Sequence, residues 1–456
     1  MNRIAGRCKA VVLLIVVLLG GLGFFTAEYF LNSGSWVLHP GSPHIYSGTN
    51  IGCGTVTDRE GYLLLDLDGN RTYAATESLR KATLHWLGDR NGSISAPAVA
   101  AYAQQMAGYN AITGLYSYSG AGRAELTLSA KVQTAALEAM GEYKGTIAIY
   151  NYKTGQILCA VTTPTYDPGN VPDIEGDPET YQGVYLNRFT QSKYVPGSIF
   201  KIVTTAAALE EIPDIREQTF ECTGVYDYSS RDDVTCEKVH GTLDFDSAMA
   251  QSCNCAYAAI VDQLGPKKLA QYVDKYQVTK PVSFDGITTV SGNFDVSDAA
   301  KVQVAWSGIG QHKDQVNPCR FLTFMGAIAN GGQAVEPYLV ERVINGDSVT
   351  YQAKAKQSDR IMPEETAAEL QKMMRNNVIE KYGVENFPDL LVCAKSGTGQ
   401  VGGEQEPNAM FAGFLMDEEY PLAFMVAVED GGYGRHVCIP ILTPVLEACM
   451  ELLDAE

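Results

Sequence analysis

The pattern of apolar and polar positions divides the chain into three parts. Residues 10–27 form one uncharged apolar run near the N-terminus. Residues 28–125 show little periodicity and are rich in Gly, Ser and Tyr, which predicts a small pedestal domain of short strands, with a short helical or extended piece at 78–88. Over residues 126–456 strand-like and helix-like patterns follow one another, which predicts a second, larger domain.

In the larger domain, strands come first and last and helices lie between them. Apolar residues three and four apart predict helices over 129–140, 198–209, 243–251, 255–264 and 442–453, with Asn254 as the N-cap of the fourth. Apolar runs bounded by turn residues predict strands over 145–152, 156–161, 390–401, 409–416 and 420–428. This order is typical of an α+β fold, in which one antiparallel sheet is flanked by helices.

The apolar run at 10–27 predicts a membrane anchor. Its 18 uncharged residues, at 1.5 Å each, nearly span a bilayer core of about 30 Å. Arg3, Arg7 and Lys9 precede the run, so residues 1–9 are expected in the cytoplasm and the chain from Glu28 onward outside it. A cleaved signal peptide is the alternative, although residues 25–27 make a poor cleavage site.

Charge and cysteine content exclude some functions. A formal net charge of −19 over 456 residues argues against a nucleic-acid partner, because its phosphates would be repelled. The six histidines are scattered, and no His/Cys cluster with metal-ligand spacing is evident, so we expect no metal, no other cofactor and no histidine-based triad. Cys222 and Cys236 flank a polar, loop-like stretch and could close a disulfide or remain free thiols.

Three short motifs carry the candidate chemistry. In chain order they are Ser198-Ile199-Phe200-Lys201, Ser252-Cys253-Asn254 and Lys395-Ser396-Gly397-Thr398. Each is short enough to occur by chance, so the inference depends on their order and on the local structure around each motif.

The first motif offers a nucleophile and a base. Ser198 and Lys201 are three residues apart at a helix start, so an unprotonated Lys201 could take the Ser198 proton. This requires a lowered lysine pKa, which burial or a cation such as Lys395 can supply. In the alternative interpretation Ser198 only caps the helix and Lys201 is solvated.

The other two motifs could complete an acyl-transfer site. Ser252 and Asn254 could face one cleft from a turn between helices, although both could be plain helix caps. On a strand edge, Lys395 and the hydroxyls of Ser396 and Thr398 could hold a carboxylate, while Gly397 leaves room for a backbone or ligand. The alternative is a solvated strand end. The amides of Ser198 and Thr398 could form an oxyanion hole.

These motifs, with other strings in the same order, resemble the class B penicillin-binding proteins. The further strings are residues 54–61, 71–73, 153–155, 164–168, 186–188, 194–198, 309–311, 329–331 and 411–413. The resemblance implies a penicillin-binding transpeptidase fold and a monofunctional peptidoglycan D,D-transpeptidase of the bacterial cell membrane. Two departures are Ile199, where threonine is usual, and Met410, where tryptophan is frequent.

The resemblance also implies roles for the residues of the motifs. Ser198 is acylated by the penultimate D-Ala of a stem peptide or by a β-lactam, with Lys201 as base and Ser252 and Asn254 completing the proton network. Lys395 and its strand neighbours hold the substrate carboxylate. The implied partners are peptidoglycan stem peptides, lipid-linked glycan strands and a SEDS-type membrane glycosyltransferase.

Three other functions use the same residue types. A D,D-carboxypeptidase would use water as the acceptor, and a class D-like β-lactamase would hydrolyse its acyl-enzyme, although Asn254 and the anchor argue against the lactamase. A non-catalytic β-lactam sensor or scaffold is the third alternative. Only about nine residues precede the anchor, which argues against a cytoplasmic signalling module.

Overall fold

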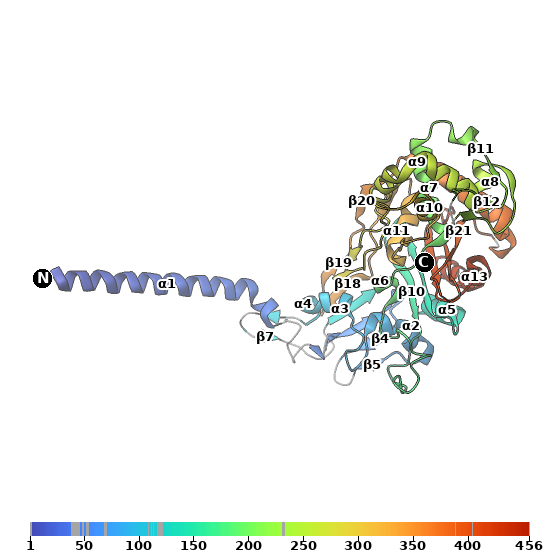
Figure 1. The fold of residues 1–456 in the computed structure, drawn as a ribbon. Coiled ribbons are helices and arrows are strands. Elements are labelled where there is room, and N and C mark those ends of the chain that lie inside the picture. The colour runs from blue at the N-terminus through green and yellow to red at the C-terminus, as the bar shows by residue number, and fades with distance from the viewer. Residues whose placement is uncertain are drawn as a thin grey trace.

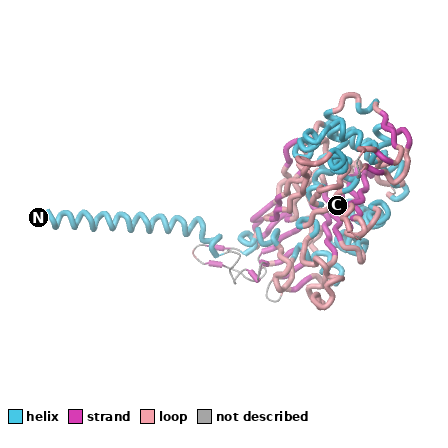
Figure 2. The backbone as a smooth tube through the Cα atoms, in the orientation of Figure 1, coloured by secondary structure: helices cyan, strands magenta, loops and turns pink. Residues whose placement is uncertain are grey.

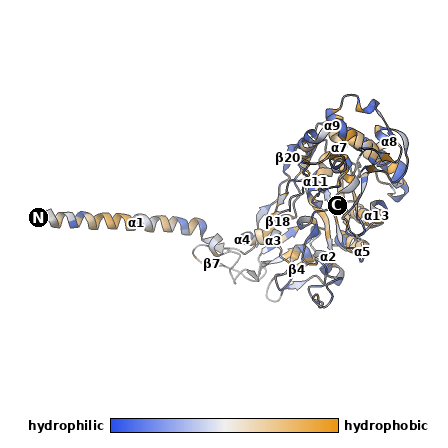
Figure 3. Ribbon diagram, viewed as in Figure 1, coloured by the Kyte–Doolittle hydropathy of each residue, from blue (hydrophilic) through white to orange (hydrophobic). Residues whose placement is uncertain are grey.

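The first helix extends away from the rest of the molecule. In the computed structural model, the described residues are 2–37, 46–47, 50–51, 54–67, 71–107, 109–110, 112, 114–115, 122–229, 233–387, 389–403 and 405–455. Helix α1 (Asn2–Val37) contains the predicted anchor and extends as a single rod, apolar along most of its length (Figures 1 and 3). The most apolar stretch of 18 residues in α1 contains no buried residue. In the other long apolar helix, Gly434–Leu453, half of the corresponding stretch is buried inside the protein.

A five-stranded antiparallel sheet forms the centre of the larger domain (Figure 2). In spatial order its strands are β10 (Ile157–Thr163), β9 (Gly145–Asn151), β23 (Leu422–Val428), β22 (Asn408–Leu415) and β21 (Val392–Gly399). The five predicted strands are therefore present, and the first and last segments of the domain meet where β9 pairs with β23. Strand β21, which carries the third motif, lies at one edge.

Helices cover both faces of this sheet. Along β9, Ile147 and Ile149 belong to one apolar core, while Ala148 and Tyr150 belong to the core on the opposite face, as the two-residue period of a strand requires. The helices on the first face are α5 (Ala130–Met140) and α13 (Gly434–Leu453), and those on the second include α11 (Pro318–Ala329) and α12 (Glu364–Asn377). This arrangement confirms the predicted α+β fold.

A helical layer next to β21 carries the first two motifs. Its elements are η1 (Gly197–Phe200), α7 (Lys201–Glu211), α8 (Phe245–Ala250), α9 (Asn254–Lys275) and α10 (Lys301–Gly308). The first motif thus begins as one 3₁₀ turn that continues into α7, and the second lies in the turn between α8 and α9. A small arm of paired strands precedes α8, formed by β11 (Thr219–Cys222), β12 (Val225–Tyr226), β13 (Val234–Thr235) and β14 (Gly241–Asp244).

A second sheet joins the N-terminal region to later residues. Its strands, in spatial order, are β19 (Ser348–Gln352), β18 (Val340–Asn345), β8 (Gly122–Leu126), β3 (Thr55–Thr57), β4 (Leu63–Asp66) and β5 (Thr72–Tyr73). Because β18 pairs with β8, the predicted pedestal (28–125) shares this sheet with residues from the larger domain, and the boundary remains a prediction. The piece at 78–88 is helical, as α2 (Glu77–Leu87).

Shorter elements complete the described chain. The remaining helices are α3 (Pro97–Ala101), α4 (Ala103–Ala107), α6 (Arg188–Gln191), η2 (Ile215–Glu217), η3 (Val378–Tyr382) and η4 (Val384–Asn386). The remaining strands are β1 (Tyr46–Ser47), β2 (Asn50–Ile51), β6 (Tyr109–Asn110), β7 (Gly114–Leu115), β15 (Ser283–Phe284), β16 (Ile287–Thr288), β17 (Gln333–Val335) and β20 (Gln357–Arg360).

Two predicted helix starts are wrong. The helix predicted from residue 243 begins at Phe245, because residues 241–244 pair with β11 as strand β14. The last helix begins at Gly434 instead of residue 442 and contains Pro440 and Pro444 in its interior.

Candidate active site

The three motifs meet at one pocket of about 670 Å³ between β21 and the helical layer. Ser198, Ser252 and Asn254 contribute to its walls, together with Ser396 and Thr398 from the edge strand. The two lysines of the motifs lie almost fully buried, with side-chain exposures of 0% for Lys201 and 1% for Lys395. Segments about 200 residues apart in the sequence therefore build one site.

Lys201 is held by the second motif. Its Nζ donates to the Ser252 carbonyl oxygen at 2.6 Å, to Asn254 Oδ1 at 2.7 Å and to Ser252 Oγ at 3.1 Å. The same nitrogen lies 5.2 Å from the centroid of the Tyr257 ring. The alternative of a solvated Lys201 is therefore wrong. Within the described part of the chain, no hydrogen bond joins Lys201 Nζ to Ser198 Oγ, although Ser198 is half-buried on the pocket wall.

Ser252 links the two buried lysines. Its Oγ accepts hydrogen bonds from Lys201 Nζ at 3.1 Å and from Lys395 Nζ at 3.0 Å. Lys395 Nζ also donates to the Ser396 carbonyl oxygen at 3.0 Å. The backbone of Ser252 has a φ of 53°, in the left-handed region that costs a residue with a side chain about 1–3 kcal/mol. The surrounding contacts hold this hydroxyl between the two amines.

Burial changes the protonation of both lysines. Burial, reinforced by the nearby charge of Lys395, lowers the pKa of Lys201 to about 7. Burial also lowers the pKa of Lys395 to about 7, but the carboxylate of Glu237 opposes this change. Because the two buried amines repel each other when both are charged, each favours loss of the proton from the other.

Asn254 does not cap the helix that follows it. The N-cap of α9 is Cys253, whose Sγ accepts a hydrogen bond from the Ala256 amide at 3.4 Å. The Asn254 side chain is used elsewhere: Oδ1 accepts from Lys201, and Nδ2 donates to the Thr235 carbonyl oxygen at 2.7 Å. The prediction of Asn254 as N-cap is therefore wrong. Its side-chain oxygen, which would have to accept a backbone amide of α9, accepts from Lys201 Nζ instead.

Strand β21 and the turn η1 approach each other closely. A Cβ atom added at Gly397 would lie 2.5 Å from the Pro196 carbonyl oxygen and 3.1 Å from the Ile199 amide nitrogen. At Gly197, where φ is +54°, an added Cβ would lie 2.3 Å from the Thr398 carbonyl oxygen. The space left by the missing side chain of Gly397 is therefore filled by the backbone around Ser198. Together, Gly397 and Gly197 allow the first and third motifs to pack this closely.

The structure adds residues that the motifs did not include. Tyr382, at the end of η3, accepts a hydrogen bond from the Ser396 amide at 2.8 Å and lies 3.1 Å from Ser396 Oγ. Gln311 Nε2 donates to the Thr398 carbonyl oxygen at 3.0 Å. Gln311 ends the string 309–311, which was noted only as part of the resemblance, whereas Tyr382 had no signal in the sequence.

The rim of the pocket is positively charged although the whole chain is acidic. Lys238, Lys381 and Arg435 line the pocket, and Glu237 is the acidic residue among the lining residues. Partial burial and the neighbouring charges of Lys238 and Arg435 lower the pKa of Lys381. Together with Lys395, these cations favour a ligand that carries carboxylates.

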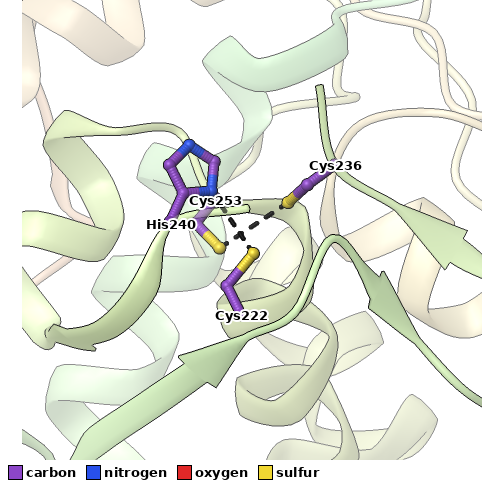
Figure 4. A group of neighbouring side chains, drawn as sticks. All are labelled: Cys222, Cys236, His240 and Cys253. Atoms are coloured by element: carbon purple, nitrogen blue, oxygen red, sulfur yellow. Dashed lines mark hydrogen bonds between the residues drawn. The ribbon is translucent and has the colours of Figure 1, made fainter. Parts of the chain in front are cut away.

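Cysteine side chains gather beside the pocket. Cys222, Cys236, His240 and Cys253 point toward one another, and their four ligand atoms all lie within 4.8 Å (Figure 4). Cys222 and Cys236 are free thiols, so the disulfide considered between them is not formed. No metal-ligand spacing in the sequence indicated this cluster. In the sequence, 13 residues separate Cys222 from Cys236, 3 separate Cys236 from His240 and 12 separate His240 from Cys253. The four side chains become neighbours only in the folded chain.

Comparisons with known proteins identify the family. The family model described as the penicillin binding protein transpeptidase domain matches residues 145–447. The chain belongs to the penicillin-binding protein transpeptidase family. This membership confirms the predicted fold, the predicted class B penicillin-binding protein and its serine-type acyl-transfer chemistry.

Individual relatives agree with this assignment. The chain is 29% identical over 339 residues to peptidoglycan D,D-transpeptidase PbpA of Mycolicibacterium smegmatis, a match that covers 68% of each chain. It is 29% identical to stage V sporulation protein D of Bacillus subtilis over 71% of this chain and 52% of that protein. Penicillin-binding protein A of M. tuberculosis, solved as a ceftriaxone acyl-enzyme, superposes with a TM-score of 0.76 at 21% identity and covers 87% of this chain and 98% of that one.

Proposed function

We propose that this penicillin-binding transpeptidase is a membrane-anchored peptidoglycan D,D-transpeptidase that acts through an acyl-enzyme on Ser198. One observation carries the proposal: the three motifs meet in one pocket, where Ser252 Oγ links two buried amines beside Ser198. The names of curated relatives, such as peptidoglycan D,D-transpeptidase PbpA, support the activity.

Acylation needs a base for the Ser198 proton. Lys201, with its pKa lowered to about 7, is partly neutral at physiological pH and accepts this proton. Ser198 Oγ then forms a C–O bond to the carbonyl carbon of the penultimate D-Ala, and the C–N bond to the terminal D-Ala breaks. Ser252, which contacts Lys201, relays the proton to the departing nitrogen, so that D-Ala leaves with a neutral amine.

The edge strand binds the substrate and stabilises the transition state. Lys395, whose charged form is favoured by a bound carboxylate, holds the terminal carboxylate of the stem peptide together with the hydroxyls of Ser396 and Thr398. The amides of Ser198 and Thr398 donate to the oxyanion, and each such donor is typically worth about 2.7–4 kcal/mol in the transition state. Asn254 keeps Lys201 directed toward Ser252.

Transfer of the acyl group regenerates the enzyme. An amine from a second stem peptide attacks the ester carbon, a C–N bond forms and the bond to Ser198 Oγ breaks. The proton of the attacking amine returns to Ser198 through Lys201. The cationic rim formed by Lys238, Lys381 and Arg435 suits stem peptides and β-lactams, because both carry carboxylates.

The test is covalent labelling with a fluorescent penicillin. The full-length protein in detergent should form a long-lived adduct of one penicillin per chain, measured by intact mass over time. Ser198→Ala should abolish the adduct, and Ser291→Ala, at an exposed serine outside the pocket, should not. An adduct that persists in Ser198→Ala would refute the assignment of the nucleophile.

The same experiment separates the alternative functions. A β-lactamase would release the hydrolysed penicillin quickly, so its adduct would decay. A scaffold would form no adduct. With a synthetic donor peptide and an amino-acid acceptor, a carboxypeptidase would release D-Ala without forming the exchanged product, whereas the proposed transpeptidase forms both.

We also propose the membrane arrangement and a partner. The exposed apolar helix α1 supports an uncleaved anchor, and the charges of Arg3, Arg7 and Lys9 support a catalytic domain outside the cytoplasm. Protease added to intact spheroplasts should then digest this domain, and protection until lysis would contradict the topology. Lipid-linked glycan strands would be polymerised by a SEDS-type membrane partner, which should co-purify with the wild type and not with a chain whose α1 is exchanged for an unrelated anchor.

A further inference from the structure

We propose that Cys222, Cys236, His240 and Cys253 form a structural zinc site that holds the Ser252–Asn254 turn in its active conformation. Cys222 ends β11, Cys236 follows β13, His240 precedes β14 and Cys253 caps α9. One ion would therefore join the strand arm to the turn that contains two of the proposed active-site residues. The binding of zinc is independent of the proposed function, and only its effect on acylation rests on that function.

The positions of the ligand atoms suit tetrahedral zinc. Zinc–sulfur bonds of about 2.3 Å at tetrahedral angles place two sulfur atoms about 3.8 Å apart. Cys236 Sγ and Cys253 Sγ are 3.7 Å apart, and Cys222 Sγ is 3.3 Å from His240 Nδ1 (Figure 4). Three thiolates and one imidazole are a ligand set that structural zinc sites use, and soft sulfur ligands disfavour Mg²⁺ and Ca²⁺.

Burial and the surrounding backbone also suit a metal. Cys222 and Cys253 are buried, with exposures of 1% and 0%, while Cys236 and His240 reach the pocket and leave a path for an ion. Cys236 Sγ accepts hydrogen bonds from the Asn254 amide at 3.0 Å and the Cys255 amide at 3.4 Å. Amide hydrogen bonds of this kind orient thiolate ligands and stabilise their charge.

The consequence of zinc binding follows from charge and connectivity. Binding of Zn²⁺ converts three thiols to thiolates, releases three protons and leaves the imidazole neutral, so the filled site carries a net charge of −1. Without the ion, only hydrogen bonds join the turn to the strand arm, such as the one from Asn254 Nδ2 to the Thr235 carbonyl oxygen, and the left-handed backbone of Ser252 is held less firmly. Cys222, Cys236 and His240 are thus positioning residues, which act on the reaction through Ser252 and Asn254.

The experiment measures zinc directly. Untagged full-length protein in detergent is reduced with a non-chelating phosphine, incubated with zinc chloride and dialysed. Zinc is then measured by elemental analysis and native mass spectrometry. We expect one zinc per chain in the wild type and in Cys319→Ser, which removes a buried free thiol of α11 outside the cluster. Cys222→Ser and His240→Ala should bind zinc at least tenfold more weakly in competition with a chromophoric chelator.

A second measurement tests the positioning role. Removing zinc from the wild type should slow penicillin acylation about tenfold, and Zn²⁺ but not Mg²⁺ should restore the rate. One zinc per chain without any penicillin adduct would support the metal site and count against the proposed function.

Several results would overturn the proposal. One is that the reduced wild-type protein takes up no zinc from zinc chloride. This result does not depend on whether any variant folds. Another is a disulfide between two cysteines of the cluster, located by peptide mapping in the purified protein before reduction. Zinc retained equally by Cys222→Ser and His240→Ala would place the metal elsewhere.

Discussion

Replacing Lys395 with glutamine should move the pH dependence of Ser198 acylation to higher pH. Lys201 accepts a proton only when neutral, so the acylation rate should fall about tenfold per pH unit below its pKa, which burial and the charge of Lys395 lower to about 7. Removing the positive charge of Lys395 makes protonated Lys201 more stable. Its pKa should therefore rise, and the acidic limb of the profile should move with it.

The size of this change follows from the geometry. Lys201 Nζ and Lys395 Nζ lie 3.1 and 3.0 Å from Ser252 Oγ, so the two nitrogens are at most 6.1 Å apart. Two unit charges at that distance repel by about 2.7 kcal/mol at an effective dielectric constant of about 20. This energy corresponds to about two pH units when Lys395 is fully charged. Because the pKa of Lys395 is itself lowered to about 7, only part of this repulsion acts where Lys201 titrates, and the midpoint of the variant should rise by about one to two pH units. The other groups that face Lys201 are unchanged by the substitution, namely Cys236, Glu237, Cys253 and Tyr257.

The assay is the second-order rate constant of penicillin acylation between about pH 5.5 and pH 9.5. Lys395→Gln also weakens carboxylate binding and lowers the rate at every pH, so the midpoint of the acidic limb is the readout. Lys381→Gln is the matched control, because Lys381 lines the same pocket, whereas the hydrogen bonds to Ser252 Oγ within the described residues come from Lys201 and Lys395. A midpoint in Lys395→Gln within about 0.3 pH units of the wild type would refute the assignment of Lys201 as a base controlled by Lys395.

Three further substitutions test other parts of the site. Gly397→Ala should lower the free energy of unfolding by about 1–3 kcal/mol and slow acylation, because its Cβ meets the Pro196 carbonyl oxygen; an unchanged thermal midpoint would contradict this close contact. Tyr382→Phe should lower the free energy of unfolding by about 0.5–1.5 kcal/mol, because the amide of half-buried Ser396 loses its acceptor; thermal unfolding measures this, and an unchanged stability would mean that water replaces the hydroxyl. Arg435→Gln should weaken binding of a carboxylate-bearing penicillin less than tenfold and reduce its salt dependence; a loss that is independent of salt would argue against a purely electrostatic role.

The sequence predicted the architecture well where local patterns decide it. The strands of the central sheet are continuous apolar runs because helices bury both of their faces, and such runs can be recognised without a structure. The helix predicted from residue 129 is present as α5, with Ser129 as its N-cap, and residues 153–155 lie between the two predicted strands β9 and β10. The three motifs were recognisable because their residue types are those that acyl transfer needs.

Long-range contacts decide the features that the sequence did not reveal. Asn254 and Cys253 could both cap a helix, and only the contact between Asn254 and Lys201 decides which of them does. Tyr382 reaches Ser396 from a helix end 14 residues earlier, a pairing that no periodicity indicates. The ligand atoms of the Cys222 cluster come from the end of β11, the loop between β13 and β14 and the N-cap of α9, and the spacing of these segments in the sequence does not indicate that they meet.

The last helix begins eight residues before its predicted start and contains two prolines in its interior. Pro440 and Pro444 usually mark the start or the end of a helix, since proline lacks an amide donor. In α13 the apolar side chains around them, Cys438 and Leu442 among them, are fully buried against the sheet. Tertiary packing therefore outweighs the local cost of the prolines.

The most direct test of the central claim is to identify the residue that a β-lactam acylates. After brief exposure of the full-length protein to penicillin G, digestion and tandem mass spectrometry locate the added mass. The account predicts a single modified peptide, with the added mass on Ser198. An adduct on Ser252, on Ser396 or on any residue outside the pocket would contradict the roles assigned to all three motifs.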